Sequence, residues 1–449
     1  MRHLILTAIL FCLSGTLTGQ VTLINPQTDQ KLLKDFQNRK LGLFVHWMAC
    51  HTPETGDSWS IGNGTSKQVA DSITLAWNPV NFNPKEIVDF AVKAGCKYIV
   101  VISKHHDGFA IWNSQFSNWD LERIKFKRDI LKELESEAHK RGLLFGIYYS
   151  IADIHYAGWK SMPAAPNPPA TPKGGKEAFV QFVHNQVKEL IKNYKPDILW
   201  FDGHWLDPLW GPKEGKELYN LVKSLKPSTL STRLSVTRAA GGVRGTETFI
   251  ADGSSGDFFS YEAKTQNAPA FPWEACTSVS YPVYAYEPKA KMHTKEELVN
   301  TFSKVLCGNG NFLLNIGPER TGELPKQLTD RFLEFSDWVN QYKDAVYNTS
   351  AGPFKQGAWG GSTYKDNKIY LHLRNPAASI KITSQQLKGY KPESVVDLKT
   401  GKPLKLEKLD DGYLINTSSV GESGLIPVIA IKLNRKYIFT KWEDQLAAI

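Results

Sequence analysis

The stretch Pro196-Asp-Ile-Leu-Trp-Phe-Asp-Gly203 decides the fold class of this chain. Its apolar run ends in an acid followed by glycine, which is typical of a buried strand that carries a carboxylate at its C-terminal end. Two runs upstream have the same form: Leu41-Gly-Leu-Phe-Val45 leads into His46, and Tyr98-Ile-Val-Val-Ile-Ser103 leads into Lys104-His-His-Asp107. Because a parallel barrel gathers its strand ends at one face, these runs predict a barrel with a single pocket.

Strand-like runs alternate with helix-like runs as far as residue 316. Strands are predicted at Leu41–Val45, Tyr98–Ile102, Leu143–Tyr149, Ile198–Phe201, Thr229–Leu234, Glu274–Val279 and Phe312–Ile316. Helices are predicted at Pro84–Ala94, Arg128–Lys140, Glu177–Tyr194, Glu214–Leu225 and Thr294–Leu306. This alternation predicts a parallel sheet, and its length favours a closed (β/α)8-like barrel over an open sheet.

The helix expected at Glu177–Tyr194 has the pattern of a helix that covers a sheet. Val183, Val187 and Leu190 are spaced to form one apolar stripe. Glu189 lies between these positions, and we expect its side chain to face solvent.

The sequence changes character beyond about Ala351. Helical periodicity stops there, and short β-rich runs separated by Gly, Pro, Asp and Asn predict a small β-sandwich. These runs are Lys368–Leu373, Ser379–Ile382, Ser394–Leu398, Gly412–Ile415 and Leu425–Leu433. We therefore expect a signal peptide at residues 1–19, a (β/α)8-like catalytic domain at 20–348 and a C-terminal β-sandwich domain at 349–449.

The N-terminus has the build of a secretory signal peptide. Arg2 and His3 precede the apolar run Leu4–Leu13, and small residues follow as far as Gly19. That run is too short to span a bilayer, and no later segment reaches spanning length. We expect cleavage near Gly19 or Gln20 and a secreted or periplasmic protein.

Composition places the chain among ordinary globular proteins. It has 449 residues, of which 41% are hydrophobic and 22% charged, and a formal net charge of +9. A modest positive charge indicates non-specific attraction to polyanions more than a defined polyanionic partner. Cys50, Cys96, Cys276 and Cys307 have neither a zinc spacing nor the density of a disulfide framework, so we expect buried thiols.

Two carboxyl groups, one ionised and one protonated, can cleave a glycosidic bond when their surroundings separate their pKa values. Asp202 is one candidate, with helix capping or pairing with a base as the structural alternative. Its partner is Glu262 or Glu274, each of which follows an aromatic residue. If that aromatic surface covers the carboxyl, it raises the pKa and suits a general acid. Spacing alone leaves both partners open.

Histidines at strand ends are the second set of candidates. His46, His105 and His106 can donate hydrogen bonds to sugar hydroxyls. A rival interpretation is a zinc site that these histidines form with Asp107 or Asp202. Neither H-x-H nor H-E-x-x-H occurs in the sequence, which weakens that rival.

Tryptophans near the strand ends and acids are candidates for stacking on a pyranose ring, although large aromatic residues more often fill a core or a rim. They are Trp47, Trp59, Trp112, Trp200, Trp205 and Trp273. Each of them alone indicates little.

Five stretches together resemble one family. They are His46-Trp47, Lys104-His-His-Asp-Gly-Phe109, Phe145-Gly-Ile-Tyr-Tyr-Ser150, Leu199-Trp-Phe-Asp-Gly203 and Gly308-Asn-Gly-Asn-Phe-Leu-Leu-Asn-Ile-Gly-Pro318. In this order they resemble the α-L-fucosidases of glycoside hydrolase family 29, over roughly residues 30 to 345. The resemblance implies a (β/α)8-like barrel followed by a β-sandwich, which agrees with the fold expected from periodicity.

The resemblance also implies roles for single residues. Asp202 matches the catalytic nucleophile, and His46, His105 and His106 match histidines that hold fucose hydroxyls. Arg233 resembles an arginine that follows the nucleophile strand. Glu262 matches the acid/base, because Gly256-Asp-Phe-Phe-Ser-Tyr-Glu262 has the spacing of the family's Gly-Asp-Tyr-x-Thr-Pro-Glu stretch.

The remaining expected substrate contacts are aromatic. Trp59 resembles the tryptophan of the family's Ser-Glu-Trp-Tyr stretch, although here Ser58 replaces the acid before it. Trp47 and Tyr149 lie within matched stretches, and Trp273 stands beside one candidate acid.

The activity implied is that of a secreted, retaining exo-α-L-fucosidase that acts on fucosylated glycans by double displacement. We expect no cofactor, no metal, no nucleic-acid partner and no membrane span, and the sequence predicts no oligomeric state. One alternative is a catalytically impaired glycan-binding protein, because Ser260-Tyr261 replaces Thr-Pro. The other is an α-L-galactosidase relative, whose sugar differs at C6.

Overall fold

The computed structural model describes residues 28–62, 64–156, 174–206, 209–235, 237–238, 247–248, 254–262, 271–421 and 425–438. The expected signal peptide lies outside the described residues. All the candidate site residues lie within them.

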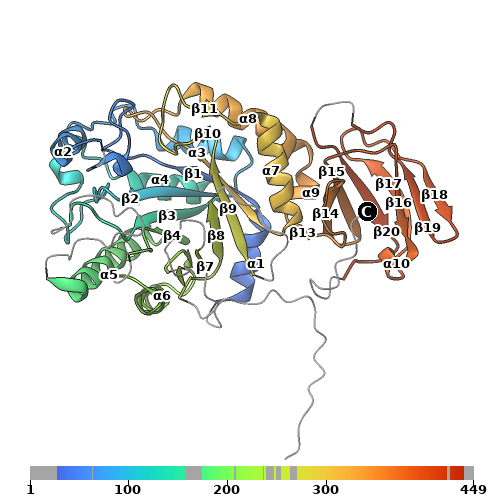
Figure 1. Ribbon diagram of the computed structural model, residues 1–449, viewed down its shortest axis with the longest axis horizontal. Helices are drawn as coiled ribbons and strands as arrows, with labels where there is room; N and C mark the ends of the chain where they lie inside the picture. The colour runs from blue at the N-terminus through green and yellow to red at the C-terminus, as the bar shows by residue number, and fades with distance from the viewer. Residues whose placement is uncertain are drawn as a thin grey trace, which may run out of the picture.

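The N-terminal part of the chain is built around one eight-stranded sheet, in which every strand pair is parallel (Figure 1). The strands are hydrogen-bonded in the order β5-β4-β3-β2-β1-β12-β9-β8. Their bounds are β1 Leu41–Val45, β2 Tyr98–Lys104, β3 Leu144–Ser150, β4 Ile198–Asp202, β5 Leu230–Thr232, β8 Phe259–Glu262, β9 Trp273–Ser278 and β12 Asn311–Ile316. This order confirms the predicted barrel, although β8 was not among the predicted strands.

The two edges of the sheet, β5 and β8, meet at a seam that a side chain closes. The Asp257 N–H donates to the carbonyl of Ser231 at 2.7 Å, and Asp257 Oδ2 accepts from the N–H of Ser231 at 2.7 Å. Thr232 Oγ1 donates to the carbonyl of Phe258 at 2.7 Å. A carboxylate thus provides a hydrogen bond that a strand pair would provide elsewhere in the barrel.

Helices cover the outside of the barrel. They are α2 Lys67–Leu75, α3 Pro84–Lys93, α4 Ile130–Lys140, α5 Gly175–Tyr194, α6 Pro212–Leu225, α7 Lys295–Cys307, α8 Lys326–Gln341 and α9 Lys343–Val346. Short elements in the connections are η1 Ser58–Ser60, η2 Leu121–Arg123, β6 Thr237–Arg238, β7 Glu247–Thr248, β10 Ser280–Tyr281 and β11 Lys291–Met292. Asn83 caps α3 by accepting from the N–H of Lys85, directly before the proline that begins the helix.

Helix α1, Gln30–Arg39, plugs the N-terminal end of the barrel, and the sequence patterns did not predict it. Its Phe36 contacts Tyr98 and Phe258, with ring centroids 5.3 Å and 4.6 Å away. Because this end of the barrel is filled by apolar side chains, the pocket lies at the opposite end, where the strands terminate.

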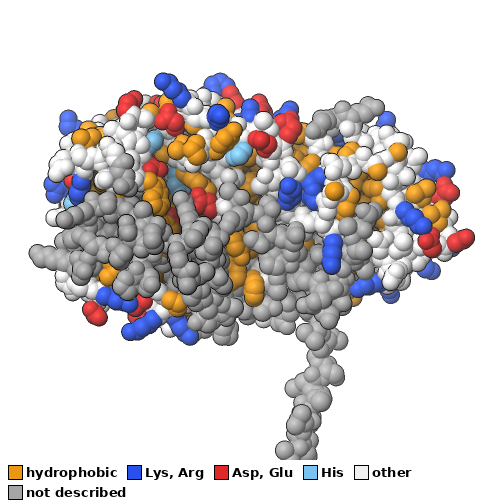
Figure 2. All heavy atoms as spheres, in the orientation of Figure 1, with side chains coloured by type: hydrophobic (Ala, Val, Ile, Leu, Met, Phe, Trp, Pro, Cys, Tyr) orange, Lys and Arg blue, Asp and Glu red, His pale blue; other side chains and the backbone are white. Residues whose placement is uncertain are grey.

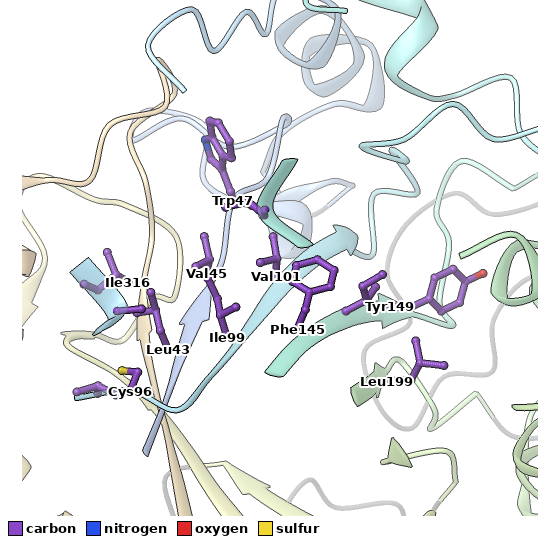
Figure 3. Close-up of a cluster of buried hydrophobic side chains, with 14 of the residues drawn as sticks. Leu43, Val45, Trp47, Cys96, Ile99, Val101, Phe145, Tyr149, Leu199 and Ile316 are labelled. Atoms are coloured by element: carbon purple, nitrogen blue, oxygen red, sulfur yellow. The ribbon is translucent and has the colours of Figure 1, made fainter. Parts of the chain in front are cut away.

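Apolar side chains along the barrel strands alternate between two hydrophobic clusters. Phe44, Tyr148 and Trp200 belong to the cluster inside the barrel. Their neighbours along the chain belong to the cluster between strands and helices, which includes Leu43, Val45, Ile99, Val101, Phe145, Leu199 and Ile316 (Figure 3). This period of two decides which residues can reach the pocket.

Helix α5 differs from the expectation at one position. The predicted apolar stripe is buried, but Glu189 is buried as well, with 9% of its surface exposed. Its carboxylate accepts from Trp112 Nε1 at 2.8 Å and from the N–H of Gln115 at 2.8 Å. Glu189 therefore ties α5 to the loop after β2 instead of facing solvent.

Two antiparallel sheets follow the barrel. One has the order β13-β14-β15-β20-β17, and the other β16-β19-β18. Their bounds are β13 Ser350–Ala351, β14 Gly360–Lys365, β15 Lys368–Leu373, β16 Ser379–Thr383, β17 Pro392–Asp397, β18 Leu406–Leu409, β19 Gly412–Asn416 and β20 Val428–Leu433, with the short helix α10 at Ser384–Leu387. Ile382 and Ile415 of the smaller sheet share one core with Leu371 of the larger, as expected of a β-sandwich. Helix α7 lies between this sandwich and the barrel (Figure 1).

On the face in view, the basic and acidic side chains of the described residues are interspersed (Figure 2). Cys50, Cys96, Cys276 and Cys307 are buried, as predicted, and all four are free thiols. None of the helices in the described part of the chain combines the length and the apolar composition that a bilayer crossing requires.

Candidate active site

Asp202 ends β4 on the inner face of the barrel, and both of its carboxylate oxygens accept hydrogen bonds. Tyr148 donates its hydroxyl to Oδ2 at 2.9 Å, and Arg233 donates from Nη2 to Oδ1 at 2.9 Å. Burial alone would raise the pKa of Asp202, but the positive charge of Arg233 holds that pKa well below its usual range. Asp202 is therefore ionised and oriented, as a nucleophile must be.

Arg233 reaches Asp202 from an unusual backbone conformation. Its φ of 61° lies in the left-handed region, which a long side chain rarely adopts. Its guanidinium lies over the Trp200 ring, 4.6 Å from the centroid. Burial would lower the pKa of Arg233, but the carboxylate of Asp202 raises it, so this pair stays charged.

His46, one residue beyond β1, is held in a single tautomer. Its Nδ1 lies 2.8 Å from Oδ1 of Asn315. The amide nitrogen of Asn315 donates to the carbonyl of Tyr284 at 2.7 Å and to Ser278 Oγ at 2.9 Å, so its oxygen must be the acceptor. Burial lowers the pKa of His46 to about 3, which leaves Nε2 as an unprotonated acceptor. The sequence suggested a donor at this position, whereas the structure provides an acceptor.

His106 is fixed in the same way. Ser150 donates its hydroxyl to the carbonyl of Ala152 at 2.6 Å, so it accepts from Nδ1 of His106 at 2.7 Å. Nε2 of His106 lies 3.8 Å from Oδ2 of Asp202. Burial lowers the pKa of His106, so its Nε2 is a second acceptor beside the carboxylate.

A bulge at the end of β2 brings His105 into the pocket. The register against β3 shifts between Ile102 and Lys104, and Lys104 consequently points outward to Gln186 and Tyr149, at 3.1 Å from each. The next residue, His105, returns to the inner face, where its ring stacks on Tyr148 with centroids 5.5 Å apart.

Ser58 occupies the position at which the family stretch has an acid. Its Oγ lies 2.7 Å from Nδ1 of His105, so a hydroxyl here orients a pocket histidine. Trp59 follows it, and its partly buried ring meets His106 edge to face at 5.0 Å and stacks on Trp205 at 6.1 Å. These two tryptophans give the pocket an apolar wall beside its acceptors.

The two candidate acids lie at different levels of the barrel. Glu262 is the last residue of β8 and lies on the same face of that strand as the inward-pointing Ser260. Its side chain is exposed, since the strand ends there. Burial is the main cause that raises the pKa of Tyr148 and of Tyr284, and the carboxylate of Glu262 adds to both shifts. Glu262 is thus close enough to affect Tyr148, the tyrosine that donates a hydrogen bond to Asp202.

Glu274 instead lies deep inside the barrel with 1% of its surface exposed. Burial raises its pKa to about 7, against the opposing effect of hydrogen bonds from Tyr98, Trp200 and Ser260. A group in this position cannot reach a leaving group at the barrel mouth. Glu262 is therefore the better candidate for the acid/base.

The structure corrects three expected substrate contacts, and the physical reason is strand alternation. Trp47 packs edge to face on Trp77 at 5.0 Å in the outer cluster, and Tyr149 lies in that cluster too (Figure 3). Trp273 is buried at the start of β9, where its Nε1 donates to the carbonyl of Gly308. Each of them neighbours an inward-facing residue along the chain and consequently points outward.

Several pocket residues have no role in the sequence-based predictions. Tyr148, Asn315 and Ser58 hold Asp202, His46 and His105, and His204 Nδ1 lies 4.0 Å from Oδ1 of Asp202. The sequence carries a signal for Tyr148. It lies two residues before Ser150, the strand partner of Asp202, so its side chain is on the same face of the sheet as that of Asp202. Asn315 and Ser58 carry no sequence signal apart from the matched stretches.

One cluster in the described residues has the composition of a metal site. Ligand atoms of His105, His106 and Asp202 lie within 4.8 Å of one another. The guanidinium of Arg233 already neutralises Asp202 at 2.9 Å, and a divalent cation on the same carboxylate would be repelled by it. The donor set fits a pocket for a neutral, hydroxyl-rich ligand better than a metal centre.

In sequence, the chain is similar to α-L-fucosidases. The family model described as alpha-L-fucosidase matches residues 22–344. The tissue alpha-L-fucosidase of Rattus norvegicus is 26% identical over 424 residues, which cover 81% of this chain and 84% of that protein. The alpha-L-fucosidase of Dictyostelium discoideum is 26% identical, with 78% of this chain and 76% of that protein covered.

Solved structures show the same architecture. Alpha-L-fucosidase isoenzyme 1 from Paenibacillus thiaminolyticus superposes with a TM-score of 0.77 at 26% identity, covering 90% of this chain and 99% of that one. A family 29 alpha-L-fucosidase from Bacteroides thetaiotaomicron, trapped as a covalent intermediate in a complex with 2-fluoro-fucosyl fluoride, superposes with a TM-score of 0.78 at 22% identity, covering 90% and 96%. At this level of identity, the superposition with the Bacteroides thetaiotaomicron enzyme shows that the two proteins share a fold.

Proposed function

Since this chain belongs to the α-L-fucosidases of glycoside hydrolase family 29, we propose that it is a retaining exo-α-L-fucosidase with Asp202 as nucleophile and Glu262 as acid/base. The observation that carries this proposal is the geometry of Asp202: its two carboxylate oxygens accept hydrogen bonds from Tyr148 and Arg233, and Nε2 of His106 lies 3.8 Å from Oδ2. The covalent intermediate of the Bacteroides thetaiotaomicron enzyme supports a double displacement.

The first half-reaction forms the glycosyl-enzyme. Asp202 attacks the anomeric carbon of a terminal α-L-fucosyl residue, and the bond from that carbon to the leaving oxygen breaks. Glu262 gives its proton to the leaving oxygen, so the alcohol departs neutral. As the ester forms, Asp202 loses its charge.

The second half-reaction restores the enzyme. Glu262, now a carboxylate, takes a proton from water while the water oxygen attacks the anomeric carbon. The ester bond breaks, Asp202 leaves as a carboxylate, and fucose is released with its configuration retained. Arg233 and Tyr148 stabilise Asp202 in its charged form before and after each cycle.

The walls of the pocket suit a deoxy sugar. Nε2 of His46 and of His106 can each accept from a sugar hydroxyl, because Nδ1 carries the proton in both rings. Trp59 and Trp205 offer apolar surface beside them, which suits the C6 methyl group of fucose better than a hydroxymethyl group. This favours fucose over galactose.

The altered stretch before Glu262 supports turnover instead of a binding-only protein. Ser260 points into the barrel toward Glu274, and Tyr261 points outward onto Trp273 with centroids 6.1 Å apart. Ser260 and Tyr261 thus pack on opposite faces of β8 without changing its course. Glu262, two residues after Ser260, therefore still faces the inside of the barrel.

Hydrolysis of aryl α-L-fucosides tests the proposal. We expect release of the aryl alcohol with α-L-fucose as first product by NMR, and much weaker cleavage of aryl α-L-galactosides. Asp202→Ala should abolish turnover. Glu262→Gln should slow substrates with poor leaving groups on the order of 10²–10⁴-fold and activated ones much less. Retained turnover in Asp202→Ala, or β-L-fucose as the first product, would overturn the mechanism.

We also propose that the protein is exported, to the periplasm or beyond the cell. The signal-like composition of residues 1–19 supports this. N-terminal sequencing of protein from the source cell's exported fraction should find a start at about Gln20 or Val21. An intact Met1 would argue against export.

A further inference from the structure

The buried carboxyl of Glu274 has no part in the proposed mechanism, although three side chains inside the barrel donate hydrogen bonds to it. Its Oε2 accepts from the Tyr98 hydroxyl at 2.6 Å, and its Oε1 accepts from Trp200 Nε1 at 3.0 Å and from Ser260 Oγ at 3.3 Å. The three donors come from β2, β4 and β8. A buried carboxyl that accepts from three strands has one well-defined position.

Trp200 links this carboxyl to Asp202. It precedes Asp202 by two residues on β4, so both side chains lie on the inner face. One neighbour of its ring is the Arg233 guanidinium, 4.6 Å from the centroid, and another is the Tyr148 ring, 5.5 Å away and nearly parallel. These are the two groups that donate to Oδ1 and Oδ2 of Asp202.

An indole has a single hydrogen-bond donor, its Nε1–H, and the ring orientation follows from where that donor points. In Trp200 it points at Glu274. We propose that Glu274 is a positioning residue: it orients the Trp200 ring, and through this ring it sets the places of Arg233 and Tyr148 on the Asp202 carboxylate. This inference rests on the proposed role of Asp202 as nucleophile.

The test compares Glu274→Gln with Glu274→Leu on two aryl α-L-fucosides, one with a good and one with a poor leaving group. Glutamine keeps an acceptor for Trp200, so we expect it to retain roughly a third or more of kcat, whereas leucine should lose on the order of 10²-fold, because small displacements of a nucleophile cost that much. The loss should be the same for both substrates and should fall on kcat, with KM changed less than about threefold.

Glu189 provides the matched control, because it is also a buried carboxyl that accepts a tryptophan N–H, but outside the barrel. Glu189→Leu should lower the melting temperature while kcat stays within about twofold of wild type. If Glu274→Leu is no slower than Glu189→Leu, Glu274 is only structural and the inference fails. A loss confined to the poor leaving group would make Glu274 a proton donor and would also overturn it.

A second pair of variants keeps the test decisive if Glu274→Leu does not fold. Glu274→Asp shortens the side chain and withdraws the carboxylate from Trp200, and it should cost about tenfold in kcat. In a Trp200→Phe background the same change should cost almost nothing, because the phenyl ring has no N–H to hold. Additive losses would contradict action through Trp200. Failure of the proposed function would be seen separately, as an inactive wild type or an active Asp202→Ala.

Discussion

Oδ1 of Asn315 lies 2.8 Å from Nδ1 of His46, and this contact makes the imidazole a hydrogen-bond acceptor toward the pocket. Asn315→Asp would place a carboxylate at this distance, which raises the pKa of His46 from about 3. Below the new pKa the imidazolium could not accept from a sugar hydroxyl. Relative to the wild type at the same pH, we expect kcat/KM of the variant to be reduced in acid and to recover as the pH rises.

The measurement is a pH profile of kcat/KM for both proteins, with KM fitted separately. Asn315→Leu is the control, since it removes the contact without adding a charge and should lower kcat/KM at every pH. A variant profile parallel to that of the wild type would show that His46 does not act as an acceptor.

Tyr148 and Tyr149 are adjacent residues whose substitution should have different effects. Tyr148→Phe removes the hydroxyl that donates to Oδ2 of Asp202, and a hydrogen bond to a charged group is worth about 1.5–3 kcal/mol, so kcat/KM should fall by about 10- to 150-fold. Tyr149→Phe removes a hydroxyl bonded to Gln186 outside the barrel, so it should affect stability while kcat/KM stays near wild type. Equal kinetic losses in the two variants would refute the assignment of faces.

Asp257 closes the seam between β5 and β8, and its removal should be costly. Its carboxylate pairs with Lys223 at 3.1 Å and accepts from Ser231, Thr28 and Tyr219 while fully buried. Asp257→Asn keeps the shape but leaves Lys223 uncompensated, which should lower the free energy of unfolding by about 3–5 kcal/mol. Urea titration measures this loss.

Lys223→Met is the comparison for that variant. It leaves Asp257 with its remaining donors, so the loss of stability should be smaller. If both variants lose the same amount, the ion pair and not the seam accounts for the effect.

His372 predicts acid sensitivity far from the pocket. Burial lowers its pKa to about 3, whereas an unfolded histidine has a pKa near 6.5. As pH falls below 6.5 the unfolded chain gains a proton that the folded chain does not, so stability is lost in this window. His372→Gln should reduce the fall in unfolding free energy between pH 7.5 and pH 5 by about 2 kcal/mol. Urea titrations at the two pH values test this, and an unchanged difference would show that His372 does not contribute.

The barrel could be predicted because its strands are buried on both faces and read as continuous apolar runs. The strand predicted at Leu41–Val45 has the observed bounds, and the one predicted at Ile198–Phe201 is one residue short. Strand β8, Phe259–Glu262, was missed because it is short, and Ser260 and Glu262 break its apolar pattern. Helix α1 was missed because its apolar positions plug the barrel end instead of covering the sheet.

The pocket was only partly predictable. Asp202 and the histidines follow strand ends, which is a signal in the sequence. Three of the four expected aromatic contacts lie outside the pocket, because neighbours along a strand point to opposite faces, as Trp47 beside His46 and Trp273 beside Glu274 show. The bulge before Lys104 interrupts this alternation, so that His105 and not Lys104 faces the pocket. No pattern in a single sequence predicts such a bulge.

The seam at Asp257 has a consequence for how such a barrel can change. Between Asp202 on β4 and Glu262 on β8, the ladder of strand pairs runs the long way around the barrel. Across the short way, the seam is held by the hydrogen bonds of Asp257 and Phe258 with Ser231 and Thr232. The gap between two acids distinguishes retention from inversion of configuration. Lengthening or shortening the chain on one side of this seam would therefore move one acid relative to the other, while His46, His105 and His106, which follow β1 and β2, keep their places.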